Sequence, residues 1–87
     1  MVARTASSGA HGDIEVGYND IWGVQMNTND TTTLSELSAS KAITTLTVIK
    51  KSDRSTVTAT SANNIVTLTQ AGLTNEDLLI FAAGVAA

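Results

Sequence analysis

Apolar and polar residues alternate in the first half of this chain, beginning near residue 14. Two groups of three apolar residues have a spacing of two: Ile14, Val16 and Tyr18, followed by Trp22, Val24 and Met26. This spacing places side chains on one face of a β-strand. Asn19-Asp20 separates the groups, and both residue types tolerate turns. We therefore expect two strands joined by a hairpin turn, or one strand interrupted by a bulge.

The clearest alternation lies between residues 43 and 70, where threonine occupies many of the alternate positions. The apolar positions between the threonines are Leu46 and Val48, Val57 and Ala59, and Val66 and Leu68. Threonine combines β-branching with a hydroxyl that tolerates solvent, so it suits the outer face of a sheet. Turn-forming residues at Ser52-Asp53 and at 62–64 divide the segment. The pattern predicts a three-stranded meander with its threonines facing outward.

Two other segments are harder to assign. Residues 27–42 are polar, and their one helical signal is the capping-box spacing of Thr33 and Glu36. Their serines compete for backbone hydrogen bonds, so we expect a single helical turn or an ordered crossover loop. The apolar run 78–86 follows a turn at 71–77 and is compatible with a capped helix or a central strand. We choose the strand, because the neighbouring segments already form a sheet that needs covering.

The N-terminal residues 1–12 are rich in Gly, Ala and Ser. Such a composition buries little apolar area, so we expect a flexible arm, with a frayed terminus as the simpler alternative. Residues 13–87 then form a single β-rich domain. The predicted fold class is all-β, a small antiparallel β-sandwich or barrel with a flexible N-terminal arm. Deleting residues 1–12 is expected to leave folding intact and to weaken assembly.

Composition narrows the classes of function. The chain has 87 residues, one Trp, one Tyr and one Phe, so its core must be built mainly from aliphatic side chains. A small core of this kind gains stability by docking or by forming a homo-oligomer. Cysteine is absent and histidine occurs once, which excludes disulfides and a histidine-based structural zinc site. A net charge of −3 argues against direct nucleic-acid binding. No signal peptide is visible, and the longest apolar run is too short to span a membrane, so no membrane partner is expected.

The candidate chemistry is sparse. The one base of suitable pKa is His11, which falls in the predicted arm, whereas catalysis needs rigidly held groups. We therefore expect no enzymatic activity and no cofactor. Asp13, Glu15 and Asp20 match no calcium-binding loop and are expected to be solvated, with no bound metal. The candidate interface residues are Arg4 and His11 in the arm, and the aromatic residues Tyr18, Trp22 and Phe81. For Trp22 and Phe81 the core is the alternative location.

One stretch near the C-terminus has the sequence Asn64-Ile65-Val66-Thr67-Leu68-Thr69-Gln70-Ala71-Gly72-Leu73-Thr74-Asn75-Glu76-Asp77-Leu78-Leu79-Ile80-Phe81-Ala82-Ala83-Gly84-Val85. This stretch resembles the C-terminal ends of small virion proteins of tailed bacteriophages. The resemblance covers about the last quarter of the chain. It implies a capsid decoration (cement) protein on the virion surface, made in the host cytoplasm and bound to the major capsid protein or another virion protein. The resemblance assigns no binding residue to a position of this chain. A tail-tube or head-tail connector component is an alternative, as is a carbohydrate-binding or adhesion module with Trp22 and Tyr18 as a stacking platform.

Overall fold

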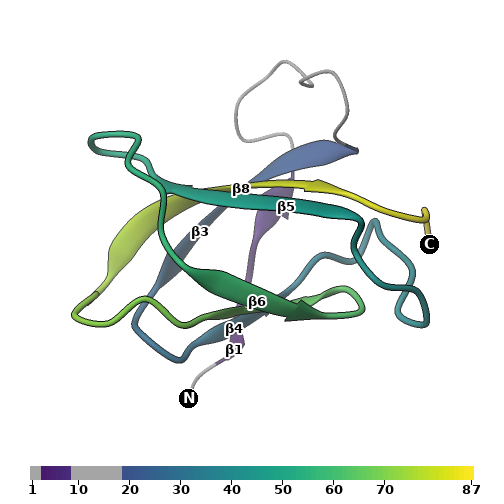
Figure 1. The fold of residues 1–87 in the computed structure, drawn as a ribbon, viewed down its shortest axis with the longest axis horizontal. Coiled ribbons are helices and arrows are strands. Elements are labelled where there is room, and N and C mark those ends of the chain that lie inside the picture. The colour runs from purple at the N-terminus through teal and green to yellow at the C-terminus, as the bar shows by residue number, and fades with distance from the viewer. Residues whose placement is uncertain (1–2, 9–18) are drawn as a thin grey trace.

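The computed structural model describes residues 3–8 and 19–87, and all regular structure within them is β-strand (Figure 1). The strands are β1 (Ala3–Arg4), β2 (Ser7–Ser8), β3 (Asp20–Met26), β4 (Thr31–Thr33), β5 (Thr45–Lys50), β6 (Ala59–Ala62), β7 (Ile65–Leu68) and β8 (Glu76–Ala83). They form two four-stranded sheets with the orders β1-β4-β7-β6, here the β6 sheet, and β2-β3-β8-β5, here the β8 sheet. Neighbouring strands are antiparallel except β1 and β4. The all-β prediction is confirmed.

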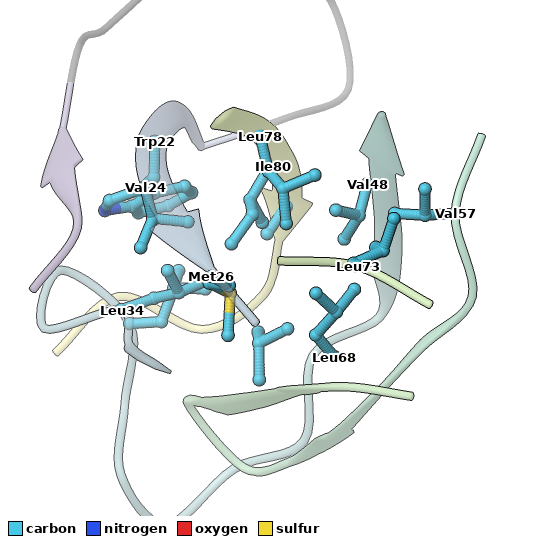
Figure 2. Close-up of a cluster of buried hydrophobic side chains, with 13 residues drawn as sticks. Trp22, Val24, Met26, Leu34, Val48, Val57, Leu68, Leu73, Leu78 and Ile80 are labelled. Atoms are coloured by element: carbon cyan, nitrogen blue, oxygen red, sulfur yellow. The ribbon is translucent and has the colours of Figure 1, made fainter. Parts of the chain in front are cut away.

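The hydrophobic core lies between the two sheets (Figure 2). The β8 sheet supplies Trp22, Val24, Met26, Val48, Leu78, Ile80 and Ala82, the β6 sheet supplies Val66 and Leu68, and the connections supply Leu34, Leu37, Val57 and Leu73. The alternating pattern predicted this arrangement for β3 and β7, because every second residue of each strand points inward. Phe81 is not a member of this cluster, so Trp22 is the one aromatic side chain of the core that residues 3–8 and 19–87 form.

Strand β8 is one of the two inner strands of its sheet, as predicted for most of the run 78–86. It pairs with β3 along seven residues and with β5 along six. Leu78, Leu79 and Ile80 are consecutive and all buried, which is typical of a strand covered on both faces. The strand continues only to Ala83, and beyond it Ala86 makes an isolated bridge to Leu37.

The predicted three-stranded meander is wrong in one connection. β6 and β7 form the expected hairpin, with a turn at Asn63-Asn64 and a left-handed φ of 53° at Asn63. β5, however, belongs to the opposite sheet. Residues after the turn at 51–53 return beside β5, where the Val57 N–H donates to the Val48 carbonyl at 2.9 Å. The chain then crosses to the β6 sheet at Ala59. Alternation fixes which face of a strand is buried, but it does not fix which sheet the strand joins.

The polar segment 27–42 contains a strand and no helix. β4 occupies Thr31–Thr33, and a tight turn follows in which the Leu37 N–H donates to the Leu34 carbonyl. The buried position of β4 is Thr32, which is 1% exposed and donates its hydroxyl to the Arg4 carbonyl at 2.8 Å. The Glu36 side chain forms a hydrogen bond with the Asp20 side chain, whereas the capping-box spacing had suggested Thr33 as its partner. We expected a single helical turn or an ordered crossover loop, and neither expectation included the strand β4.

The described part of the predicted arm lies against the domain. β1 extends the β6 sheet beside β4, and β2 extends the β8 sheet beside β3 (Figure 1). The N-terminal segment thus spans one side of the sandwich and adds an edge strand to each sheet. The predicted strand at Ile14–Tyr18 and the arm boundary at residue 12 lie outside the described residues. Asp20, expected in a turn, is the first residue of β3.

Candidate interaction surface

Arg4, Trp22 and Phe81, the predicted interface residues that the structure describes, do not gather at one place. Trp22 is 2% exposed and packs in the core, so its indole has no face available for a partner or a sugar ring. Phe81 is half-buried on β8, opposite Ile21 of β3 and Thr47 of β5. It therefore lies on the outer face of the β8 sheet. His11 and Tyr18 lie outside the described residues.

Arg4 fastens the N-terminal strand to the domain. Its Nε donates to Asp30 Oδ2 at 2.8 Å, and the Asp30 side chain is only 3% exposed, against 26% for that of Arg4. The same carboxylate oxygen accepts the Asn27 N–H at 2.9 Å. A carboxylate buried this deeply requires a cation and several donors. The guanidinium of Arg4 therefore faces Asp30 and holds β1 against the domain.

The outer face of the β8 sheet carries two buried apolar side chains. Ile21 and Leu79 are buried there, although they alternate with the core residues of β3 and β8. Beside Leu79 is a surface depression of about 360 Å³, whose polar lining includes Gln25, Lys51 and Asp77. The backbone N–H of Lys51 donates to the Asp77 carbonyl at 2.8 Å.

The outer face of the β6 sheet is uncharged. Pairing places Ala3, Thr31, Thr67 and Thr60 in one row across its four strands, and Thr33, Ile65 and Ala62 in the next. We call these seven residues the threonine face. Ile65, a large aliphatic residue of this face, is 43% exposed. The chain from Ser55 to Asn75, which contains β6 and β7, has no Asp, Glu, Lys, Arg or His. Depletion of charge is one of the compositional features of the centre of a protein–protein interface.

The threonine face ends at an open edge strand. β6 is last in the order of its sheet and pairs only with β7 among the described strands. Its residues Thr60, Ser61 and Ala62 are exposed. Natural edge strands are commonly protected by lysine, proline or an inward-pointing charge. β6 has the sequence Ala-Thr-Ser-Ala and carries none of these.

Two acidic residues of the described chain, Glu36 and Asp53, have shifted pKa values. Glu36 has its pKa raised above 4.5 chiefly by a side-chain hydrogen bond with Asp20, and further by desolvation and by the charge of Asp20. Asp53 has its pKa lowered, first by the hydrogen bond from the Ser55 hydroxyl and then by the Ser55 N–H. In the part of the chain that the structure describes, no three acidic or histidine side chains lie close enough together to hold a metal ion.

Residues 3–8 and 19–87 contain no helix that is long and apolar enough to cross a membrane.

The geometry defines a class: a small two-sheet β-sandwich with one uncharged, threonine-rich face that ends at an unprotected edge strand. Comparisons with protein-family models, with curated proteins and with solved structures found no match.

Proposed function

We propose that this protein is a non-enzymatic structural protein of a tailed-bacteriophage virion, of the capsid decoration or cement type. Its partner is the major capsid protein or another virion protein, and its site of action is the capsid surface. The observation that carries the proposal is the threonine face together with the open edge of β6. The resemblance of residues 64–85 to the ends of small virion proteins supplies the biological setting.

The threonine face suits repeated, weak contacts. Its side chains are short and uncharged, so covering them with a partner leaves no buried charge to compensate. Threonine hydroxyls can donate and accept, which lets them pair with polar groups of a partner or with bridging water. Contacts of this kind are weak singly and become strong when symmetry repeats them over a shell.

Composition supports the same role. The described core contains one aromatic side chain and otherwise aliphatic ones, with no disulfide to reinforce it. Small domains built in this way are marginally stable alone, and binding to a folded partner adds stability by mass action. A decoration protein receives that contribution from the shell while stabilising the shell in return.

The test is to incubate the purified protein with tailed-phage capsids that lack it. Co-sedimentation and an increase in the temperature of shell disruption are the expected results. The variant Thr67→Lys places a charge at the centre of the threonine face and should weaken binding at least ten-fold. The control Thr45→Lys places the same charge on an exposed position of β5, in the other sheet, and should bind normally.

Two results would contradict the proposal. The first is the absence of binding and of any thermal effect on the shells. The second is the formation of rings or tubes by the isolated protein, visible by negative-stain electron microscopy, which would favour a tail-tube or connector component.

A further inference from the structure

The free edge of β6 can be described group by group. The two-residue turn Asn63-Asn64 makes Ala62 and Ile65 a hydrogen-bonded pair, since the residues flanking such a turn exchange both backbone bonds. Pairs alternate along an antiparallel ladder, so Thr60 also bonds to β7. The N–H and C=O groups of Ala59 and Ser61 therefore point away from β7, to the free edge.

The neighbouring strand confirms this alternation. On β7 the same rule directs the backbone groups of Leu68 away from β6 and toward β4. The Leu68 N–H does donate to the Asp30 carbonyl at 3.0 Å, and the Leu68 carbonyl accepts the Asn29 N–H at 2.7 Å. The orientation of the free groups on β6 thus follows from hydrogen bonds present in the sheet.

We infer that β6 is a self-association edge, and that its partner is β6 of a second copy of this chain in antiparallel, two-fold symmetric pairing. This inference deepens the proposed function by naming the contact between copies. In this register Ala59 bonds to Ser61 of the second copy, and Ser61 bonds to its Ala59. Thr60 then lies opposite its own counterpart on the symmetry axis. The two β6 sheets join into one continuous sheet.

Three features of the edge favour a second copy. In this register Ala59 lies opposite Ser61 and Thr60 lies opposite Thr60, so each small side chain meets another small one. Threonine opposite threonine is a favourable cross-strand pair. The chain has a net charge of −3, which makes copies repel one another, but the stretch from Ser55 to Asn75 contributes no charge to that repulsion.

The contact is small, because β6 has only four residues. An edge of this length buries less than the roughly 1,200 Å² of a stable free dimer. The pairing is therefore weak in dilute solution and is populated where copies are held side by side, as on the surface of a particle. Pairing at a sheet edge also gives each copy the same orientation relative to its neighbour.

The test is disulfide trapping, for which the absence of cysteine from the chain is favourable. Directly opposed residues in a non-hydrogen-bonded pair have Cα atoms about 4.5 Å apart, within the range that a disulfide spans. Thr60→Cys should form a covalent dimer in glutathione buffer at least ten times faster than Thr33→Cys. Thr33 is the matched control, since it is an exposed threonine of the same face on β4, two strands from the edge. Native Trp22 fluorescence shows that each variant is folded.

A second measurement uses charge in place of a covalent bond. At millimolar concentration the translational diffusion of the wild-type protein, measured by NMR, should slow as copies associate. Thr60→Lys, which places two lysines opposite each other, should abolish the slowing, and Thr33→Lys should retain it. Equal trapping rates for the two cysteine variants, or diffusion independent of concentration, would overturn the inference. Neither experiment includes capsids, so failure here leaves shell binding standing, and loss of shell binding leaves β6 pairing standing.

Discussion

The most informative single substitution is Arg4→Ala, which removes the cation from a buried carboxylate. Asp30 is almost fully buried, and the Arg4 Nε lies 2.8 Å from its Oδ2. Removing one partner of a fully buried ion pair costs about 3–5 kcal/mol of unfolding free energy. Here Arg4 is 26% exposed, so water reaches the carboxylate once the guanidinium is gone, and the Asn27 N–H remains bonded. We expect a loss of about 1–3 kcal/mol.

The assay is urea unfolding followed by the fluorescence of Trp22. This residue is the single tryptophan of the chain and is 2% exposed in the folded state, so its emission reports loss of the core directly. With a urea dependence of about 1 kcal/mol per molar, the midpoint should fall by about 1–3 M. Asp30→Asn and the double variant complete a double-mutant cycle.

The cycle separates the ion pair from the other contacts of β1. The pairing of β1 with β4 and the hydrogen bond from the Thr32 hydroxyl to the Arg4 carbonyl use no side-chain atom of Arg4 or Asp30, so they survive both substitutions. A coupling energy of about 1 kcal/mol or more is expected. An Arg4→Ala midpoint equal to that of the wild type, with coupling below about 0.3 kcal/mol, would refute the role of Arg4 as the anchor of β1.

The remaining predictions concern the core and two carboxyl groups. Ile80→Ala, at a fully buried position on the inner strand β8, should lower the unfolding free energy by about 2–5 kcal/mol in the same urea assay, whereas Val85→Ala, at a 53% exposed position, should change it by less than about 0.5 kcal/mol. The raised pKa of Glu36 means that its stabilising, protonated form is fully present below pH 4.5 and is lost as the pH rises through the raised value, after which Glu36 and Asp20 repel. Glu36→Gln should therefore be more stable than the wild type at pH 7, by less than about 1 kcal/mol because Glu36 is exposed. This gain in unfolding free energy should disappear near pH 4. A larger gain at pH 4 than at pH 7 would contradict the expected sign. Ser55→Ala should raise the pKa of Asp53 toward 3.8, measured by NMR titration of its carboxyl carbon, and an unchanged pKa would show that the Ser55 hydroxyl is not the cause.

The sequence predicts the burial of individual strands well, because alternation reports directly which side chains avoid water. Val66 and Leu68 of β7 are buried and Thr69 is exposed, as the pattern indicates. β4 was missed because its buried side chain is Thr32, a polar residue satisfied by a hydrogen bond to Arg4. The Arg4 carbonyl lies in a segment far from Thr32 in the sequence, so no local pattern predicts this hydrogen bond.

The arrangement of the sheets could not be read from local patterns either. The move of the chain from β5 to β6 depends on the turn after Lys50 and on the contact of Val57 with β5, both of which are tertiary. The N-terminal strands form from a Gly-, Ala- and Ser-rich segment because β3, β4 and Asp30 offer it partners. Composition describes the segment in isolation, whereas these partners are supplied by the rest of the domain.

The candidate surface shows a similar division. Large aromatic residues are the usual sequence signal for an interface, yet Trp22 belongs to the core. The only sequence signal for the threonine face and the open edge of β6 is the alternation that places threonines on the outer face of the sheet. Their significance depends on the order of strands, which places β6 at the edge and brings Thr31, Thr67 and Thr60 into one row.

Amide hydrogen exchange, measured on the free protein and on the protein bound to capsids, tests the central claim most directly. In both states the amides shared by β3 and β8 should exchange slowly, because these strands are paired along seven residues. The account predicts that the amides of Ala59 and Ser61 exchange rapidly in the free protein and become protected on the shell. Unchanged exchange at these two amides, with new protection around Phe81 on the β8 sheet, would contradict it.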